Sequence, residues 1–550
     1  MTEAAAGAGA EAAAGAEQGA APGADHGREL GGEGRGDAGG PRRRGRRGGE
    51  GGRRSLVPEQ RPWAQPTLRM RPSEVVSEDE LEAIHLASLR ILRDIGMDFL
   101  DGEARRLLAD AGAEVDGDGA RVRFDPDMVL ERIATAPSTF RLHARNPDHS
   151  LAIGGPAMAF GSVASAPNVS DMDGGRRVGN RADYQNLLRL SQHFNIVHFL
   201  AGYPVEPVDL HASVRHLDAT FDALTLCDKP LHAYSLGRQR NLDCLELVRI
   251  ARQVDAETLE REPSIFTVIN SSSPLRLDTP MLHGMIEYSS RNQVVVMTPF
   301  TLAGAMAPVT LAGAVAQQNA EALAGIAFTQ VVRPGAPAVY GGFTSNVDMQ
   351  SGAPAFGTPE YVRTAMVGGQ LARRYGLPYR SSNVCAANAV DAQAAYESVF
   401  SLWGAVMGGV NLLMHGAGWM EGGLRASYEK LVIDADLLEM VAALLEPVVV
   451  DDDTLALDAI AEVGPGGHFF GVGHTQSRYR TAFFRPMISD WRNFESWTEA
   501  GSPEAFGRAN AIAKEILAAY EPPPMEAAVR EELEDFVARR TAEGGVATDF

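Results

Sequence analysis

The stretch SIFTVINSSSPLRLDTPMLHGMIEYSSRNQVVVMTP, residues 264–299, decides the fold because it holds two strand candidates and the helix candidate between them. SIFTVIN (264–270) and QVVVMTP (293–299) are short apolar segments of the length of a buried strand. TPMLHGMIEYSSRN (279–292) has the apolar spacing of an amphipathic helix. This order predicts two parallel strands that are joined by a crossover helix.

The same alternation continues on both sides of this unit. Helical patterns fill the intervals between apolar segments, such as RADYQNLLRLSQHF (181–194) and TPEYVRTAMVGGQLARRYG (358–376). Eight βα units in sequence predict an α/β protein with a (β/α)8 TIM barrel. An open doubly wound sheet is the rival, but it would normally carry a glycine-rich GxGxxG loop after an early strand, and the first two candidates have none. The strand candidates are MAFGSV (158–163), VHFLAGY (197–203), PLHAYS (230–235), SIFTVIN (264–270), QVVVMTP (293–299), APAVYGG (336–342), LPYRSSN (377–383) and VNLLMHG (410–416).

The barrel candidates occupy the middle of the chain, and different patterns lie on either side. We expect residues 57–155 to form an N-terminal helical cap with some β-structure, residues 156–424 the barrel, and residues 425–550 a C-terminal helical extension. Within the cap, Ser77 and Glu80 have the spacing of a capping box, which predicts the start of a helix.

Residues 1–56 are dominated by Ala, Gly, Glu and Arg and show no periodic apolar pattern. Such a composition buries too little surface to offset chain entropy, so we expect a disordered tail. Its basic run PRRRGRRGGEGGRRS (41–55) has two interpretations, a weak contact with RNA or another anion and a solvated basic tail. The generic nature of such runs favours the second.

Composition and charge exclude several classes of function. The 550 residues carry a net charge of −21, which disfavours binding of the folded body to nucleic acid or to an anionic membrane. We expect no membrane span, because no run of ~18 apolar residues is present. The three cysteines (Cys227, Cys244 and Cys385) lie far apart without a CxxC pair. We therefore expect a cytoplasmic protein with neither a disulfide framework nor a structural zinc site.

Barrel enzymes build their sites at the C-terminal ends of the strands, and here the residues are mostly aromatic or neutral polar. They include no lysine and no cluster of His, Glu and Asp at metal spacing, which disfavours phosphate binding and a metal-dependent lyase or Schiff-base aldolase. Aromatic faces attract weakly hydrated cations, and quaternary ammonium gains ~2 kcal/mol or more when it is desolvated. The strand-end residues in question are Tyr203, Tyr234, Asn270, Tyr340, Phe343, Thr344, Asn383, His415, Trp419 and Glu421.

Each of these residues also has a structural interpretation. A single aromatic at a strand end is more often core packing than part of a cage. His415 follows a buried-looking strand and fits a core histidine as well as a site residue. Glu421 lies in the glycine-rich loop GAGWMEGGL, where it fits the site and solvent equally. Cys385 has no base beside it, so we interpret it as an inert thiol.

Five stretches of the chain resemble the trimethylamine methyltransferase family, in the same order along residues 70–520. They are TLAGAMAPVTLAGAVAQQNAEALAGIAFTQVVRPGAPAVYGG (301–342), NAVDAQAAYESVFSLWGAVMGGVNLL (388–413), LRASYEKLVIDADLLEMV (424–441), GHTQSRYR (473–480) and WTEAGS (497–502). The resemblance, to a family related to methanogenesis, implies a barrel enzyme that passes a methyl group from a methylated amine to the reduced cobalt of a separate corrinoid protein. The corrinoid (cobalamin) would be carried by that partner, with no cofactor bound covalently to this chain.

The resemblance also points to one branch of the family. Archaeal trimethylamine enzymes carry pyrrolysine near the segment equivalent to SSNVCAANAVDAQ (381–393), where this chain has only standard residues. The chain is therefore more similar to the non-pyrrolysine branch, which includes glycine betaine methyltransferases. A quaternary ammonium already carries its charge and leaves as a neutral amine, so a site for it need only bind, orient and desolvate the substrate.

The resemblance and the strand-end residues together give a set of expected roles. We expect the rings to surround the ammonium, Glu421 to balance its charge, and Asn270, Thr344, Asn383 and His415 to hold the other end of the substrate, such as a carboxylate. Three alternatives remain: another methyl donor, another acceptor, and a quaternary-ammonium binding protein without catalysis. The charged C-terminal helices also permit a homo-oligomer. We assign His415, Glu421 and Asn383 to catalysis, no residue to a metal, and Tyr203, Tyr234, Asn270, Tyr340, Phe343, Thr344 and Trp419 to substrate binding.

Overall fold

The computed structural model describes residues 55–57, 59–117 and 119–547, and the chain from Ser55 onward forms one compact unit. The predicted tail lies outside the described residues, apart from its last two. A parallel sheet of seven strands lies at the centre of the fold, in the order β6-β18-β17-β14-β12-β10-β9. Its strands are β6 (Ala159–Ser162), β9 (Leu231–His232), β10 (Ile265–Ile269), β12 (Val294–Met297), β14 (Ala338–Gly341), β17 (Tyr379–Ser382) and β18 (Leu412–Ala417).

The predicted second strand is not a regular strand, although it lies between the two edges of this sheet. Parallel bridges pair Gly161 with Phe199 and Leu200 with Leu231. Beyond them, side chains replace the backbone ladder: Ala201 N donates to Ser162 Oγ (3.2 Å), and His232 Nδ1 donates to Ala201 O (2.8 Å). Both edge strands are thus bonded to this segment. The fold is α/β and TIM-barrel-like, which confirms the predicted class.

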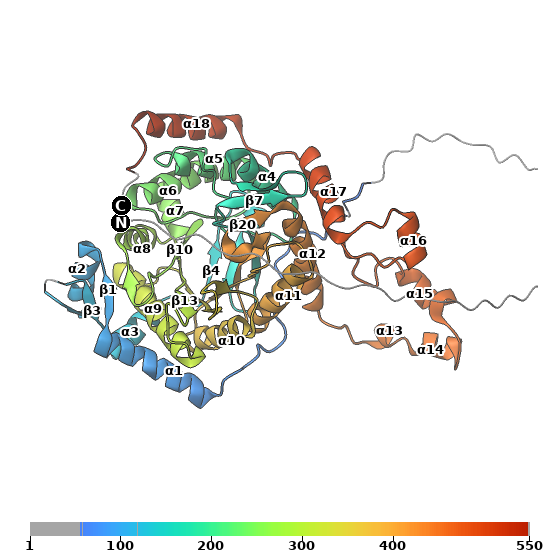
Figure 1. Ribbon diagram of the computed structural model, residues 1–550, viewed down its shortest axis with the longest axis horizontal. Coiled ribbons are helices and arrows are strands. Elements are labelled where there is room, and N and C mark those ends of the chain that lie inside the picture. The colour runs from blue at the N-terminus through green and yellow to red at the C-terminus, as the bar shows by residue number, and fades with distance from the viewer. Residues whose placement is uncertain (1–54, 58, 118, 548–550) are drawn as a thin grey trace, which may run out of the picture. The chain divides into compact units, whose positions relative to one another are not determined.

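A helix follows each of the seven strands and the bridging segment, and Figure 1 shows these helices arranged around the strands. The eighth, α12 (Tyr428–Leu444), packs against β18. We therefore propose that the barrel continues to Leu444 rather than ending at residue 424. The other seven helices are α4 (Arg181–His193), α5 (Arg215–Leu226), α6 (Arg238–Arg252), α8 (Thr279–Ser290), α9 (Leu311–Val332), α10 (Pro359–Arg374) and α11 (Ala392–Met407), and the short α7 (Ala256–Arg261) precedes β10.

Two smaller sheets are built on the loops that leave the C-terminal ends of the barrel strands. β13 (Phe300–Ala303), β15 (Phe343–Val347) and β16 (Pro354–Ala355) extend the loops after β12 and β14. β19 (Trp419–Met420), η3 (Glu421–Gly423) and β20 (Arg425–Ser427) follow β18, and β20 pairs with the hairpin β7 (Asn168–Asp171) and β8 (Gly175–Val178) that follows β6. Both sheets therefore lie at the end of the barrel where enzymes of this fold place their sites.

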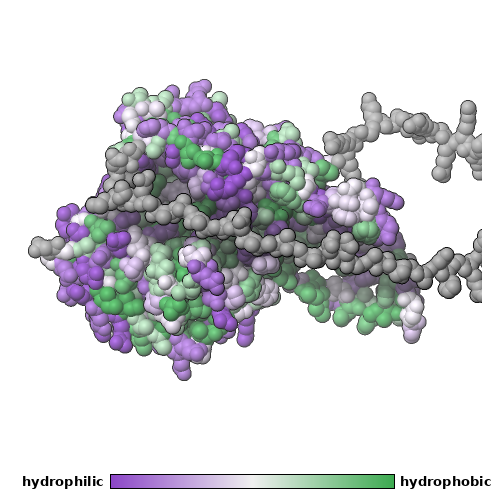
Figure 2. Space-filling model, in the orientation of Figure 1, coloured by the Kyte–Doolittle hydropathy of each residue, from purple (hydrophilic) through white to green (hydrophobic). Residues whose placement is uncertain are grey.

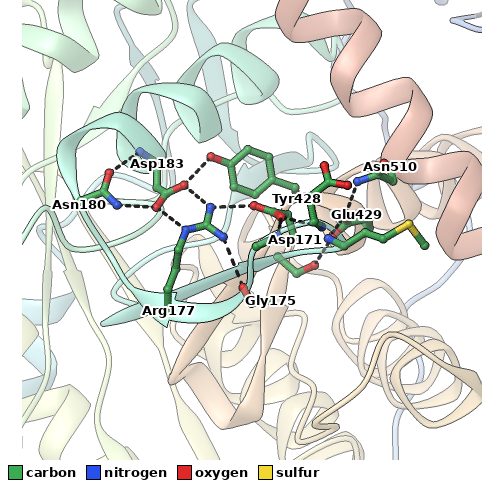
Figure 3. Close-up of polar contacts among 12 residues, drawn as sticks. Asp171, Gly175, Arg177, Asn180, Asp183, Tyr428, Glu429 and Asn510 are labelled. Carbon is green, nitrogen blue, oxygen red and sulfur yellow. Dashed lines mark hydrogen bonds and ion pairs between the residues drawn. The ribbon is translucent and has the colours of Figure 1, made fainter.

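Polar contacts attach the β7–β8 hairpin to the surrounding helices (Figure 3). The guanidinium of Arg177 bonds Asp183 of α4 (2.5 Å) and Asp171 of β7 (2.7 Å). Glu429 of α12 accepts hydrogen bonds from Met172 N and from Asn510 Nδ2 of α17 (Ala505–Ala518), both at 2.8 Å. These contacts fix the hairpin beside the loop that follows β18.

The N-terminal range packs on one side of the barrel. α1 (Glu78–Arg90) begins with the predicted capping box at Ser77 and Glu80 and packs against α9, as does α3 (Pro126–Ile133). β1 (Met97–Phe99) pairs with β11 (Arg276–Leu277) of the loop after β10. That this range forms a cap stays a prediction. The remaining elements are η1 (Ile91–Ile95), α2 (Gly102–Asp110), β2 (Glu114–Val115), β3 (Arg121–Arg123), β4 (Thr139–Leu142), η2 (Pro147–His149) and β5 (Leu151–Gly154).

The C-terminal range contains two long helices and a segment of short ones. α17 (Ala505–Ala518) packs against α12 and α4, and α18 (Ala527–Ala542) packs against α5 and α6. Between α12 and α17 lie α13 (Asp452–Leu455), α14 (Leu457–Val463), η4 (Phe469–Gly471), α15 (Gly473–Arg478) and α16 (Phe494–Glu499). We call residues 446–500 the arm. Within the described part of the chain, no helix has the length and apolar character needed to cross a membrane.

Candidate functional site at the C-terminal end of the barrel

Alternate residues of the barrel strands face the lumen and the surrounding helices. Phe266, Val296 and Met414 belong to one buried cluster, which fills the lumen. Tyr340 and Tyr379 belong to a second and larger cluster, which lies between the strands and the helices. This alternation decides which strand-end side chains reach the lumen.

An aromatic group forms where β14 and β18 end, and it brings together Phe343, His415 and Trp419. The ring of Phe343 lies 6.1 Å from that of Trp419 and 6.2 Å from that of His415, centroid to centroid. His415 stacks on Trp419 at 5.3 Å with 18° between their planes. Phe300 and Phe356 complete the group at 5.2 and 5.5 Å from Phe343. Because Phe343 and Trp419 are only 5% exposed, the half-buried rings of Phe300 and His415 are the surfaces that a ligand would meet.

His415 is held in an unusual conformation and in its neutral form. It has φ +57°, and the register of β18 with β6 shifts between Leu413 and Ala417, a bulge that re-aims the side chain. Its Nδ1 lies 3.1 Å from Ser382 Oγ. Burial, and then the charge of Arg380, lower the pKa of His415 well below 6.5. A neutral imidazole does not repel a cationic ligand.

Tyr234 lies across the lumen from this group, after β9. It is half-buried, its Oη lies 2.8 Å from Ser165 Oγ, and it accepts a hydrogen bond from Tyr203 N (3.1 Å). The Tyr203 ring lies 4.8 Å from that of Tyr234 and also contacts Tyr184 of α4. Tyr234 is therefore the ring that faces the lumen, and Tyr203 packs behind it.

Tyr340 and Thr344 point away from the lumen toward α9. Tyr340 is fully buried, and its Oη donates to Asn319 Oδ1 (2.9 Å). Thr344 Oγ1 donates to Gln318 Oε1 (2.5 Å) and also contacts the hydroxyl of Thr301. We therefore leave both residues out of the proposed site.

Asn270 and Asn383 end two of the barrel strands. Asn270 is exposed after β10, and the loop behind it is held by Glu321, which accepts from Ser273 Oγ (2.6 Å) and Leu275 N (2.9 Å). Asn383 is buried after β17, and its Nδ2 donates to Gly416 O (3.0 Å). Asn270 can reach a ligand at the C-terminal end of the barrel, which we call the mouth. Asn383 instead links the ends of β17 and β18.

The charge of Glu421 is already balanced by two arginines. Its carboxylate lies 3.0 Å from Arg176 Nε and 3.1 Å from Arg425 Nε. Arg425 also donates to Asn388 O (2.7 Å), in the loop after β17. Glu421 therefore joins three loops at the mouth, and its charge is not free to balance a substrate cation.

The sequence patterns did not single out Arg380, which lies inside β17 and faces the lumen. It is 2% exposed, and its guanidinium lies 5.4 Å from the centroid of the Phe343 ring. Nη1 donates to Gly342 O (3.3 Å), whereas Nε has no hydrogen-bond partner among the described residues. The sequence nevertheless contains a feature that could have indicated Arg380. An arginine inside a short apolar strand such as LPYRSSN is uncommon unless its charge is paired.

Neither His232 nor Cys385 is a chemically available group. His232 donates from Nδ1 to Ala201 O and accepts at Nε2 from Val268 N (3.1 Å), so both of its nitrogens are occupied. Burial raises the pKa of the Cys385 thiol to about 12, which keeps it protonated. Within residues 55–57, 59–117 and 119–547, no group of three or more His, Cys, Asp and Glu side chains could hold a metal ion.

Two buried histidines make stability depend on pH. Burial lowers the pKa of His198 to about 3 and that of His232 to about 4, against 6.5 in an unfolded chain. Below pH 6.5 the unfolded state therefore binds protons that the folded state does not bind, so acidification favours unfolding. We expect His232 alone to lower the free energy of unfolding by on the order of 3 kcal/mol between pH 6.5 and 4. Urea unfolding at pH 7, 6 and 5 measures this effect. If the free energy of unfolding of the His232→Gln variant falls with pH as steeply as that of wild type, the prediction is contradicted.

A cavity of about 430 Å³ lies at the opposite end of the barrel, lined in part by Gly155, Leu377 and Asn411, which precede β6, β17 and β18. Side chains at the N-terminal end of a barrel contribute to stability, whereas catalysis takes place at the other end. We therefore place the candidate site at the C-terminal end, where Phe300, His415, Tyr234 and Asn270 are accessible and Arg380 lies beneath them.

Comparison with known proteins identifies the family of the chain. The family model described as trimethylamine methyltransferase (MTTB) matches residues 42–545. A glycine betaine methyltransferase from Desulfitobacterium hafniense (strain Y51) is 34% identical over 472 residues, which are 86% of this chain and 98% of the relative. A trimethylamine methyltransferase from another strain of that species is 28% identical over 475 residues, with 86% and 95% covered. The solved monomethylamine methyltransferase of Methanosarcina barkeri aligns with a TM-score of 0.48 and 10% identity, over 84% of this chain and 88% of that one.

Proposed function

Because the chain belongs to the trimethylamine methyltransferase family, we propose that it transfers a methyl group from a quaternary amine such as glycine betaine to the cobalt of a corrinoid protein. The observation that carries this proposal is the aromatic group around Phe343, with the neutral imidazole of His415 at its accessible surface. Rings and a neutral imidazole stabilise an ammonium that cannot donate a hydrogen bond. The relative named as a glycine betaine methyltransferase supports this choice of donor.

The chain contributes binding, orientation and exclusion of water. The C–N bond breaks with its electron pair on nitrogen, so glycine betaine leaves as dimethylglycine and needs no proton from the protein. Among the described residues at the mouth, the two candidate nucleophiles are restrained, because the Cys385 thiol stays protonated and the ring of His415 is stacked on Trp419. This restraint fits an external methyl acceptor. A reduced cobalt corrinoid on its carrier protein supplies the nucleophile when the carrier docks.

Purified protein, a reduced corrinoid carrier and a panel of methylated amines test the proposal. We expect formation of methylated corrinoid, followed by absorbance, with glycine betaine and not with trimethylamine or dimethylglycine. Demethylation that does not depend on the corrinoid carrier would favour another acceptor. Tight binding of quaternary amines in calorimetry without any methyl loss would favour a binding protein and overturn the proposal.

We also propose that the arm binds a second copy of the chain. Figure 2 shows hydrophobic residues gathered along the segment that carries α13 and α14. The six exposed aromatics of the arm offer on the order of 800 Å², which is one partner's share of a standard interface. The same chain leaves an apolar face of α11 exposed, at Tyr396, Val399 and Trp403, which could receive a partner's arm. The large apolar side chains of the arm that are 44–88% exposed are Val448, Val449, Val450, Leu455, Leu457, Ile460, Phe469, Phe470, Tyr479, Phe483, Trp491 and Phe494.

The mass in solution tests this association. We expect light scattering to give at least twice the 58.7 kDa of one chain, and the double variant Phe470→Ser, Phe483→Ser to lower that mass toward the monomer at micromolar concentration. A wild-type protein that is monomeric at this concentration would contradict the prediction.

A further inference from the structure

We propose that Arg380 is the anchor for a carboxylate of the substrate, so that the methyl donor is a zwitterion rather than a simple quaternary ammonium ion. This inference rests on the proposed function, and it concerns the lumen side of the same site. It assigns the recognition of the anionic end of the donor to a residue of β17.

The first argument is that Arg380 is a buried charge without a counter-ion. It is 2% exposed, and none of the acidic side chains that the structure describes forms an ion pair with it. Burial lowers its pKa only to about 10, so the guanidinium stays charged at pH 7. An uncompensated buried charge opposes folding, and proteins rarely keep one unless a ligand or partner neutralises it.

The second argument is an unpaired hydroxyl close to Arg380. A Cβ added to Gly341 of β14 would lie 2.6 Å from Thr298 Oγ1 and 3.2 Å from Arg380 Cδ, so the side chains of Thr298 and Arg380 both pack against this glycine. Thr298 is 1% exposed, and its hydroxyl has no hydrogen-bond partner among the described residues. Arg380 Nε and Thr298 Oγ1 are therefore two unused donors on side chains that pack against the same glycine. A carboxylate offers two acceptor oxygens and can satisfy both.

The third argument is the position of Arg380 relative to the aromatic group. Arg380 contacts Phe343, whose ring also contacts Phe300 and His415. A donor in which one carbon separates the ammonium from the carboxylate can place its methyl groups at the accessible rings and its carboxylate at Arg380. A cation without a carboxylate would instead face the unneutralised guanidinium, and this repulsion selects against it.

Calorimetry on the whole protein, without corrinoid, tests the assignment with three probes. Glycine betaine carries both charges, 3,3-dimethylbutanoate has the same shape without the ammonium charge, and choline has the ammonium without the carboxylate. We expect wild type to bind glycine betaine most tightly, 3,3-dimethylbutanoate more weakly and choline most weakly. Loss of a charge-assisted pair corresponds to ~10–100-fold in Kd, so Arg380→Met should weaken both carboxylates by that factor and leave choline unchanged or tighter.

Two further variants separate recognition from folding. Arg380→Lys should retain part of the affinity for carboxylates, because it keeps the charge but not the fork geometry. Arg380→Met should raise the thermal midpoint of the ligand-free protein, since it removes an uncompensated charge, whereas Arg252→Met, which breaks the ion pair with Glu262, should lower the midpoint and leave binding unchanged.

Two outcomes would overturn the assignment. One is an Arg380→Met variant that binds glycine betaine and 3,3-dimethylbutanoate as tightly as wild type does, and the other is a wild type that prefers choline. Failure of the proposed function looks different: wild type would bind both carboxylates through Arg380, yet no methyl group would reach the corrinoid carrier.

Discussion

Replacing Asp434 with asparagine is expected to lower the free energy of unfolding by ~3–5 kcal/mol, because it leaves a buried ammonium without its counter-ion. Lys430 and Asp434 of α12 are 1% and 0% exposed, and Nζ and Oδ1 lie 2.5 Å apart. Lys430 Nζ also donates to Ser398 Oγ of α11 (2.7 Å), and Asp434 Oδ2 accepts from Gly418 N (2.9 Å). Since Gly418 precedes Trp419, the pair also fixes the backbone that positions the aromatic group. Urea unfolding of the two proteins measures the difference.

The chain offers a matched control for this ion pair. Lys514 and Asp173 are also paired, at 2.6 Å, but they are 56% and 63% exposed, so Lys514→Met should change stability by ~0.5 kcal/mol or less. The double variant Lys430→Met, Asp434→Leu removes both buried charges and should recover part of the loss. Equal unfolding midpoints for Asp434→Asn and Lys514→Met would show that the buried pair contributes no more than the exposed one.

The sequence predicts the order of the barrel because apolar segments and amphipathic helices alternate eight times. It does not predict that residues 197–203 lack a regular ladder. That difference depends on Ser162 and His232, which lie on the two flanking strands and bond the backbone of Ala201 through their side chains. Such contacts join residues distant in sequence, and no local pattern reports them.

The candidate site was predictable only in part, because the register of each strand decides which of its side chains face the lumen. Phe343, His415 and Trp419 come together because strand ends of a barrel converge at one face. Tyr340 was expected to join them, but one position along a strand reverses the side to which a residue points. Arg380 was missed because it lies inside its strand rather than after it, and because its orientation depends on pairing with β14 and β18.

Replacing Phe343 with leucine is expected to lower kcat/KM for methyl transfer from glycine betaine by about 30-fold. The ring contacts His415, Trp419 and the guanidinium of Arg380, so its loss disturbs both the cation surface and the proposed carboxylate anchor. This factor corresponds to about 2 kcal/mol, the attraction to the ammonium that is lost when the accessible rings of Phe300 and His415 are no longer held in place by the Phe343 ring. The same variant should bind glycine betaine more weakly in calorimetry, a readout that does not depend on the corrinoid carrier.

A second buried phenylalanine separates this effect from a general loss of stability. Phe124 is 1% exposed, packs on Phe99 at 5.8 Å, and lies in the N-terminal range away from the barrel mouth. Phe124→Leu removes the same volume from a buried position, so the two variants should lose comparable stability. Only Phe343→Leu should then lose methyl transfer and ligand affinity. If both variants lose activity to the same extent, the ring of Phe343 acts through packing alone, and the aromatic group is part of the core rather than the surface that receives the ammonium.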